Sequence, residues 1–425
     1  MFSEDFIQLM KRKTFHNGQR TFTVLSWVGG ATVIGLMVGF VASIFGLAMS
    51  YLISVRQAHK WILCFLPVGA VAIVFLYQHI LKKKDTGTNT VISAIQSDSD
   101  LPFSLAPLIF ISTLLTHLVG GSAGREGAAL QLGGAMANKV GTLFNFNDSD
   151  RKTLIMCGMS AAFSALFGTP MAAAIFSMEV VSVGIMHYAA LVPCVISSLV
   201  ARSVAESLGL TEPSYIIDVI PKFTVNNAIL ISLFAVVCGL VSIVFCMMLH
   251  QFEEHYSLWL PNPYARAMIG GTLVLLLTIL VGNSNYNSTG TDVILSCFNG
   301  ADIGLEVFIL KMIFTTITLS SGYKGGEIVP TLYIGATLGC AIGGLIGFSP
   351  ALLAAVGMGS LFCGVTNCPI TSLLICFELF GYDAMPYYLL ATAFSYWVSG
   401  YHGLYKSQKI VYSKYWSNYI DKHVK

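Results

Sequence analysis

The chain has 425 residues, of which 55% are hydrophobic and 10% are charged, and its formal net charge is +2. Soluble domains average about 45–50% apolar and about 25% charged residues, so this composition excludes an ordinary soluble domain. The small net charge also provides no strongly basic surface for binding nucleic acid. We therefore expect a protein whose partner is the lipid bilayer and not a nucleic acid.

Several apolar stretches reach the length of about 20 residues that a helix needs to cross a bilayer. The clearest run over 22–54, 61–81, 229–249 and 267–281. Residues 1–20 are polar and the first apolar run is too long for the core of a signal peptide, so no cleavable signal is indicated. The sequence predicts a polytopic membrane protein.

Basic residues gather near both ends of the chain and at 82–84, directly after the second apolar stretch. Cytoplasmic segments of membrane proteins carry an excess of Lys and Arg. This pattern predicts that both termini and the 82–84 turn face the cytoplasm. Together with the short tails and the lack of a targeting segment, it favours the inner (cytoplasmic) membrane of a bacterial-type cell.

The 10 cysteines are scattered singly through apolar segments, and the 9 histidines show no metal-ligand spacing. Isolated cysteines of this kind are usually buried, unreactive thiols. We therefore expect no metal site and no cofactor.

Four short motifs each occur twice, in the same order, which indicates that two copies of one structural unit have been fused. In membrane proteins such repeats commonly build a solute site at their interface from interrupted helices. The matching pairs are Thr86-Gly87-Thr88 with Thr289-Gly290-Thr291, Gly124-Arg125-Glu126 with Gly325-Gly326-Glu327, Gly158-Met159 with Gly357-Met358, and Pro170 and Glu179 with Pro369 and Glu378.

These pairs predict the organisation of the chain. Glu179 and Glu378 stand at the same spacing after their prolines, and we interpret both as structural. The predicted segments are a cytoplasmic N-terminal segment (1–21), a first transmembrane repeat (22–208), a linker (209–222), a second transmembrane repeat (223–403), and a short cytoplasmic tail without a regulatory domain (404–425).

Several segments within each copy are too short to cross a bilayer, such as 88–96 and 293–298. Half-helices at membrane depth are tolerated only where protein or an aqueous cavity covers their ends. Their N-termini carry partial positive charge and unpaired N–H groups, which favour an anion. Glycines beside them let the backbone approach that anion. Several such N-termini brought together predict an anion pathway.

The repeated glycine motifs resemble those of the CLC family of chloride channels and proton-coupled anion exchangers. Gly124-Arg125-Glu126-Gly127 is similar to the family's GREGP motif, with Ala128 where proline is usual, and 325–330 (GGEIVP) is similar to its GGxFxP motif. The resemblance covers about 22–409. It implies an all-α fold of two inverted-topology repeats of tilted and broken helices, and a homodimer with one pore per subunit.

The resemblance implies residue roles one position at a time. Glu126 matches the gating glutamate, which can occupy the anion's own place and leave it when protonated. Tyr405 matches the tyrosine whose hydroxyl donates to the central anion, and the family's anion-binding serine is replaced by Thr88, or by Asn89 if the register slips by one. The further implied positions are Gly87, Ile328 and Val329 for the anion, and Gly124, Arg125, Gly127, Gly325, Gly326 and Pro330 as motif support.

Departures from the family pattern narrow the expected substrate. Glu327 stands at a normally apolar position, and a carboxylate in an anion path must either bind a proton or face away. The internal proton-transfer glutamate of chloride/proton exchangers falls on Val180, so protons travel by way of Glu126 and Glu327 unless the protein is uncoupled. Both features resemble the fluoride/proton antiporter branch. We expect a transporter of fluoride and protons that exports fluoride, and not an enzyme.

Three alternatives stay open. The nearest is a chloride or other halide transporter or channel of the same fold, because donors that suit fluoride also suit chloride and spacing does not reveal cavity size. An intramembrane enzyme would use Glu126 and Glu327 as an acid/base pair, but no catalytic motif supports it. A ligand-regulated membrane protein would need a sensor domain, for which the tail after Tyr405 is too short.

Overall fold

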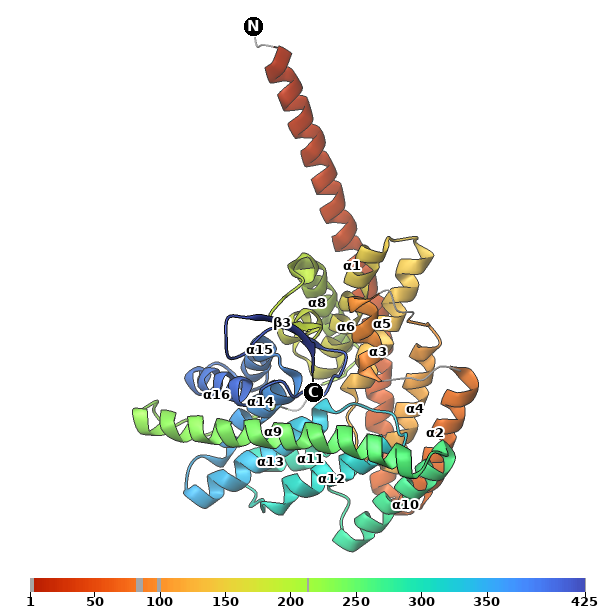
Figure 1. Cartoon of the computed structure of the whole chain (residues 1–425), viewed down its shortest axis with the longest axis vertical. Coiled ribbons are helices and arrows are strands. Elements are labelled where there is room, and N and C mark those ends of the chain that lie inside the picture. The colour runs from red at the N-terminus through yellow and green to blue at the C-terminus, as the bar shows by residue number, and fades with distance from the viewer. Residues whose placement is uncertain (1–3, 82–86, 98–100, 212–213, 425) are drawn as a thin grey trace.

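The computed structural model describes residues 4–81, 87–97, 101–211 and 214–424, with side chains from residue 24 onward. The predicted basic turn at 82–84 and the predicted motif residue Thr86 lie outside these residues. The described chain is built almost entirely from helices (Figure 1). The helices of its first half are α1 (Glu4–Ala58), α2 (Leu66–Ile80), α3 (Thr88–Gln96), α4 (Leu105–Val119), α5 (Glu126–Leu143), α6 (Asp148–Phe167), α7 (Pro170–Glu179) and α8 (Leu191–Ser207).

The second half repeats this succession of long and short helices. Two short 3-10 helices accompany the first half, at Lys60–Phe65 and Tyr188–Ala190. The helices of the second half are α9 (Val225–Trp259), α10 (Pro263–Val281), α11 (Thr291–Phe298), α12 (Glu306–Ser320), α13 (Ile328–Ile346), α14 (Pro350–Thr366), α15 (Pro369–Phe380) and α16 (Met385–Val398).

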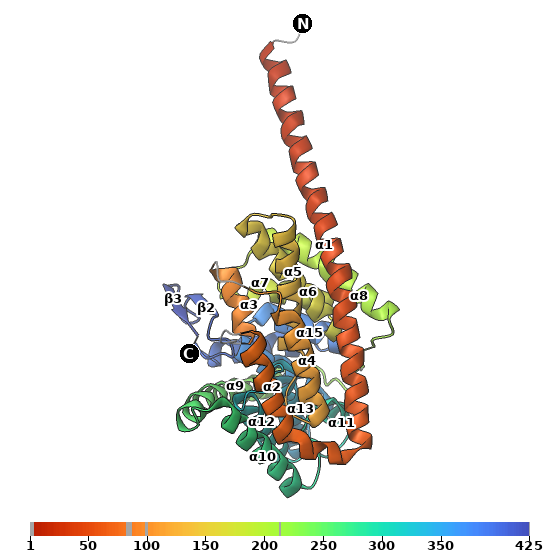
Figure 2. The same ribbon diagram turned by 90° about the vertical axis from the view of Figure 1, so that its right-hand side faces the viewer.

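Six helical segments of the described chain are long and apolar enough to cross a membrane, which confirms the prediction of a polytopic membrane protein. Others are too short to do so, as predicted: α3 has 9 residues and α11 has 8. The N-terminal end of α1 projects beyond the packed helices (Figure 2). The spanning segments are 24–58, 60–80, 188–207, 225–259, 263–281 and 328–346.

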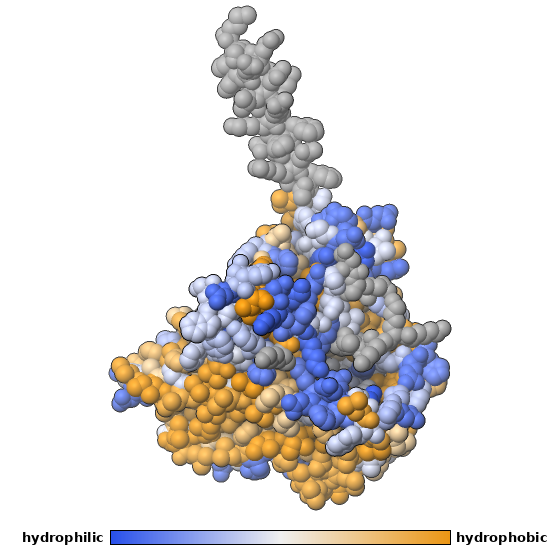
Figure 3. Space-filling view, viewed as in Figure 1, coloured by the Kyte–Doolittle hydropathy of each residue, from blue (hydrophilic) through white to orange (hydrophobic). Residues whose placement is uncertain are grey.

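Helix α9 shows why the chain is apolar on its outside as well as in its core. One of its faces is buried against the protein, where Phe234, Cys238 and Phe245 pack. Figure 3 shows apolar surface gathered over α9 and polar surface around the C-terminal strands. Because lipid is the solvent there, exposed apolar side chains are stable. The exposed face of α9 carries Ile229, Leu233, Val237, Leu240 and Val244 at helical spacing.

The two copies meet where the loops before α5 and α13 form a two-way backbone bridge. The Gly124 N–H donates to the Gly326 carbonyl at 2.6 Å, and the Gly326 N–H donates to the Gly124 carbonyl at 2.8 Å. We call this pair the glycine clasp. The helices that follow begin at Glu126 and Ile328, each at the same distance along the chain from its glycine.

The clasp corrects the predicted alignment of the two copies by one residue. Gly124 corresponds to Gly326 and not to Gly325, so the counterpart of Glu327 is Arg125 and not Glu126. The predicted match of 124–126 with 325–327 is therefore wrong by one position. Because residues 325 and 326 are both glycine, either residue can be aligned with Gly124, and the sequence alone could not decide between the two alignments.

Side-chain contacts across the clasp follow the same corrected register. The Thr116 hydroxyl on α4 accepts from the Lys324 N–H at 3.3 Å, and the Thr318 hydroxyl on α12 accepts from the Ser122 N–H at 3.1 Å. Each copy thus supports the helix-start loop of the other. This reciprocity is what a pseudo-twofold relation between fused repeats requires.

A second reciprocal contact joins α7 and α15. The Glu179 carboxylate at the end of α7 accepts from the Ile370 and Thr371 N–H groups at 3.1 and 2.8 Å, and from the Thr371 hydroxyl at 2.5 Å. In return, Glu378 near the end of α15 accepts from the Met171 and Ala172 N–H groups, both at 2.9 Å. Each carboxylate satisfies orphan donors at the start of the other copy's helix. The structural interpretation of both glutamates agrees with this geometry.

Replacing Glu378 by Gln is expected to lower stability without abolishing folding. The amide offers one acceptor where the carboxylate offers two, so one N–H of α7 would face an NH2 group. Losing this charge-assisted bond should cost about 1–3 kcal/mol. The measurement is the temperature at which the detergent-purified protein loses its monodisperse chromatographic peak. Glu254→Gln, at an exposed position of α9, is the matched control. An unchanged temperature in Glu378→Gln would contradict the capping role.

The tail forms a small sheet that the helical prediction did not include. Strands β1 (Ser182–Val183), β2 (Lys409–Tyr412) and β3 (Tyr419–His423) lie in the order β1-β2-β3, with β1 parallel and β3 antiparallel to β2. A strand of two residues has no recognisable sequence pattern. Its pairing partner is more than 200 residues away in the chain, so only tertiary structure creates the sheet.

Candidate functional site

The glycine clasp brings the N-termini of α5 and α13 face to face, and its glycines are required by space. A Cβ on Gly326 would lie 2.6 Å from the Gly127 nitrogen and 3.1 Å from the Glu126 nitrogen. A Cβ on Gly124 would lie 2.5 Å from Glu126 Oε2. Real Cβ atoms do not approach this closely, so only glycine lets the two helix starts meet.

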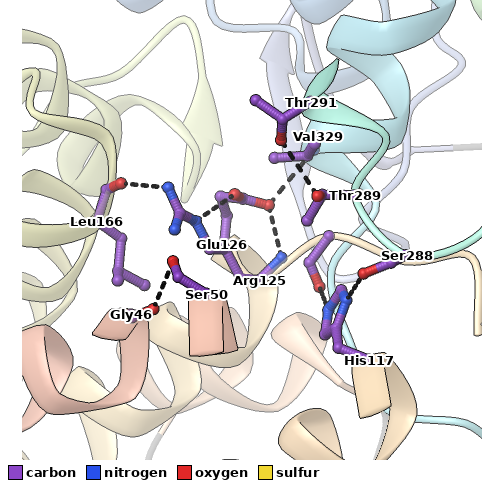
Figure 4. A network of polar contacts seen from close by, with 11 residues as sticks. Gly46, Ser50, His117, Arg125, Glu126, Leu166, Ser288, Thr289, Thr291 and Val329 are labelled. Carbon is purple, nitrogen blue, oxygen red and sulfur yellow. Dashed lines mark hydrogen bonds and ion pairs between the residues drawn. The ribbon is translucent and has the colours of Figure 1, made fainter. Parts of the chain in front are cut away.

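Glu126 is fully buried at this point, with its carboxylate turned toward backbone N–H groups (Figure 4). Oε2 accepts from the Arg125 N–H at 2.9 Å and from the Val329 N–H of α13 at 3.4 Å. Oε1 lies 3.7 Å from Arg125 Nε. The carboxylate therefore occupies the place that helix N-termini offer to an anion, and its oxygens stand in for one.

The Arg125 side chain reaches from the Glu126 carboxylate to helix α6. Its Nη2 donates to the Leu166 carbonyl near the end of α6 at 2.9 Å, as Figure 4 shows. A cation near the C-terminus of a helix interacts favourably with the helix dipole. Arg125 thus links the loop before α5 to α6, and its role as motif support stays a prediction.

His117 on α4 contacts the loop before α5 and was not predicted. Its Nε2 is 3.3 Å from the Gly124 carbonyl and its Nδ1 is 2.6 Å from the Ser288 hydroxyl. A carbonyl only accepts, so Nε2 carries the proton, and the neutral ring can accept at Nδ1 from Ser288. His117 therefore braces the clasp against the loop before α11. A lone histidine in an apolar helix offered no signal for this role.

Lys311 on α12 supports the same loop from the other side. Its side chain is fully buried, and its Nζ donates to the Tyr286 and Ser288 carbonyls at 3.1 and 2.8 Å. A buried lysine is costly unless it is hydrogen-bonded. A lysine in the middle of an apolar helix is a signal that could have been found in the sequence, because ionisable residues within membrane segments are rare and usually have a function.

The structure places the Thr88 and Asn89 side chains in different surroundings. Thr88 is buried at the start of α3, with its hydroxyl next to Gly127: a Cβ there would lie 2.9 Å from Thr88 Oγ1 and 3.5 Å from Glu327 Oε2. The Asn89 Oδ1 instead accepts from the Ser407 N–H at 2.9 Å. Thr88 and Glu327 therefore lie at the clasp, whereas Asn89 contacts the segment that carries Tyr405.

The remaining predicted positions lie around the same point and are buried, except Gly87 and Gly325, which are half-buried. Gly87 is the N-cap of α3 with φ of 66°, a conformation that favours glycine. Ile328, Val329 and Pro330 form the buried first turn of α13, and the Gly325 α-carbon packs against Ala123. Tyr405 is buried and lies within electrostatic reach of both Glu126 and Glu327.

Three buried oxygens at this site form no hydrogen bond within the described part of the chain: Glu126 Oε1, Glu327 Oε2 and the Tyr405 hydroxyl. Most buried polar groups in native proteins are hydrogen-bonded, so such a gathering needs an explanation. A phenol hydroxyl and a protonated carboxyl group can donate to an anion or to its water, and the two carboxyl groups can each hold a proton. No group of three or more His, Cys, Asp or Glu side chains in the described ranges could hold a metal ion.

Comparisons with known proteins agree with this geometry. The family model described as voltage gated chloride channel matches residues 68–400. A chloride/fluoride channel protein of Pseudomonas syringae pv. tomato is 32% identical, over 92% of this chain and 88% of that protein. A crystal structure of a CLC-type fluoride/proton antiporter is 32% identical with a TM-score of 0.88, and the match covers 91% of this chain and 98% of that chain.

A more distant structure shares the fold alone. The crystal structure of a slow cyanobacterial chloride/proton antiporter is 18% identical with a TM-score of 0.77, over 88% of this chain and 94% of that one. The predicted fold class, a helical membrane protein of two related repeats, is thereby confirmed.

Proposed function

The chain belongs to the voltage gated chloride channel family, and from that premise we propose that it is an antiporter that exports fluoride in exchange for protons. The observation that carries the proposal is the position of Glu327, whose carboxyl oxygen lies at the glycine clasp beside Thr88 and Gly127. The relatives described as acting on fluoride, at 32% identity, support the choice of this anion.

Glu126 is the gate in this proposal. Its carboxylate accepts from the Arg125 and Val329 N–H groups and so closes the path to an anion. Protonation removes the charge that these N–H groups stabilise, and the neutral side chain can leave. An incoming anion then accepts from the same two groups. The exchange of a carboxylate for an anion at one place couples proton uptake to anion passage.

Glu327 and Thr88 supply the donors that fluoride requires. Fluoride is small and tightly hydrated, so a site must replace its water with short, strong hydrogen bonds. A protonated carboxyl group and a hydroxyl group can both donate, and the Tyr405 hydroxyl can donate from the other side. Val180, at the place of the internal acid of other exchangers, cannot carry a proton, so Glu126 and Glu327 carry it.

The proposal also includes the boundaries of the repeats, the membrane location and the oligomeric state. We assign 22–208 and 223–403 to the two repeats of the transport unit, joined by the linker 209–222. We place the protein in the cytoplasmic membrane with both termini inside the cell, as a homodimer with one pore per subunit and without enzymatic activity. Support comes from the apolar outer surface, the basic ends of the chain and the transporter relatives.

Chloride transport by the same site is the second candidate, because a solved chloride/proton antiporter shares the fold. The deciding experiment is anion efflux from liposomes that hold the purified protein, with fluoride and chloride run in parallel and pH recorded. Fast fluoride efflux with little chloride efflux, accompanied by protons moving the opposite way, is the expected result. Chloride efflux equal to or faster than fluoride efflux would refute the fluoride assignment.

A further inference from the structure

The tail carries a lysine that the proposed mechanism does not use, although its ammonium group forms three hydrogen bonds to the helical part of the protein. Lys414, in the turn between β2 and β3, points its Nζ at three oxygens: Asn367 Oδ1 at 2.5 Å, the Tyr396 carbonyl at 3.0 Å and the Ser399 hydroxyl at 3.0 Å. Its Nζ also lies 4.1 Å from the centre of the Tyr396 ring. No carboxylate of the described chain forms an ion pair with it. A tail that only lay on the surface would not need a lysine bonded to three oxygens.

The direction of this hydrogen bond decides how Asn367 is oriented. An ammonium group only donates, so it must face the oxygen of the Asn367 amide. The amide nitrogen then points the other way, where it donates to the His402 carbonyl at 3.1 Å and to Gln408 Oε1 at 3.0 Å. Asn367 is buried at the end of α14 in the left-handed conformation, with φ of 60°. Its amide is thus set by Lys414.

The orientation of the Asn367 amide in turn fixes the orientation of the Gln408 side-chain amide. Because Gln408 Oε1 accepts from Asn367, its Nε2 is left to donate to the Val180 and Thr366 carbonyls, at 3.0 and 2.8 Å. The backbone of Gln408 is also tied on both sides, since its N–H donates to the Tyr405 carbonyl and its carbonyl accepts from the Val424 N–H. Gln408 is fully buried, so each of these bonds excludes water.

Tyr405 lies in the sequence between His402 and Gln408, the two residues to which the Asn367 amide donates. Asn367 holds the segment at His402 and Gln408, and Gly403 packs directly on the Asn367 amide nitrogen, where a Cβ would lie 2.6 Å away. The Leu404 N–H donates to the Val365 carbonyl at 2.8 Å. The position of the Tyr405 hydroxyl therefore depends on residues of the tail beyond it. Figure 2 shows β2 and β3 beside α3, whose Asn89 binds the same segment.

We propose that Lys414 is a positioning residue for anion transport, acting on Tyr405 through the ordered hydrogen bonds of Asn367 and Gln408. The turn between β2 and β3 that carries Lys414 is then part of the transport machinery. The inference rests on the proposed function, because it needs the Tyr405 hydroxyl to contact the anion. Lys414 itself touches neither the anion nor the carboxyl groups of the site.

The test is a double-mutant cycle between Lys414 and Tyr405, with fluoride efflux from liposomes as the readout. Lys414→Met keeps the apolar stem and removes the donors, and Tyr405→Phe removes the hydroxyl. Each single variant should raise the apparent KM for fluoride about five- to tenfold, as expected for a weakened hydrogen bond to the anion. The double variant should match Tyr405→Phe alone, because Lys414 acts only through that hydroxyl. Effects that add would overturn the proposal.

Controls separate the possible failures. Lys422→Met changes an exposed lysine of β3 outside this network and should leave the KM for fluoride unchanged. Lys414→Arg keeps donors at position 414 and should bring KM most of the way back to the wild-type value. If Lys414→Met does not fold, Asn367→Asp serves instead, because it keeps the bond to Lys414 and loses both onward donors. A wild-type KM in Asn367→Asp would overturn the inference. If Tyr405→Phe alone leaves KM unchanged, the anion role of Tyr405 in the proposed function fails.

Discussion

Replacing Glu126 by Gln is expected to abolish proton movement while anion efflux continues. The amide has nearly the same shape as the carboxylate but cannot exchange a proton at any physiological pH. It also binds the Arg125 and Val329 N–H groups more weakly, because hydrogen bonds to charged acceptors are about twice as strong as those to neutral ones. The neutral side chain should therefore leave the site open to anions, and anion efflux should lose the part of its pH dependence that comes from Glu126.

The measurement is parallel recording of fluoride efflux and pH in liposomes that hold Glu126→Gln or the wild-type protein. Glu206→Gln changes a carboxylate to an amide on the exposed part of α8, where the side chain pairs with Arg202 at 2.7 Å, and is the matched control. It should exchange like the wild-type protein. Undiminished proton movement in Glu126→Gln would refute the gate and leave Glu327 as the proton carrier to test.

Gly326→Ala is expected to cause the second large loss, because it places a methyl group inside the glycine clasp. That methyl carbon would lie 2.6 Å from the Gly127 nitrogen and 3.1 Å from the Glu126 nitrogen, both of them backbone atoms. Backbone cannot move aside as a flexible side chain can, so the two helix starts must separate. Overpacking of this kind costs about 1–3 kcal/mol. We expect transport to fall by about tenfold or more, since misplaced donors lose most of their effect.

Gly344→Ala, on the same helix α13, is the matched control for this substitution. A Cβ at Gly344 meets nothing within 4 Å, and Ala is favoured over Gly in a helix by roughly 1 kcal/mol. This variant should transport like the wild-type protein and unfold at the same or a higher temperature. Both variants are compared by fluoride efflux per folded protein, judged from the chromatographic peak. Full efflux through Gly326→Ala would show that the clasp is not part of the transport site.

Much of the architecture was predictable because it depends on local and repeated signals. The apolar stretches at 22–54 and 229–249 lie within α1 and α9, and the short segment 88–96 matches α3. Its polar hydroxyls and glycine start were recognisable before the fold was known. The motif around Glu126 was equally clear, since its glycines and carboxylate have a specific pattern.

Other features could not be predicted, because their partners are distant in sequence. His117 gains its role only when Ser288, in the other copy, is placed beside it. Lys414 lies 47 residues from Asn367, its partner, and no local pattern links the two positions. The different contacts of Thr88 and Asn89 also required three-dimensional information, because adjacent residues of a helix point in different directions.

The amino-acid sequence by itself determined that the chain is a membrane protein of two fused copies with a carboxylate among helix starts, because composition, periodicity and repetition are properties of the chain alone. Only the tertiary structure decided the register between the copies. A slip of one residue at 325–326 leaves the local pattern intact, but it changes which atoms meet. The Gly124–Gly326 hydrogen bonds select one register, in which Glu327 is the counterpart of Arg125 and lies near Gly127 and Thr88.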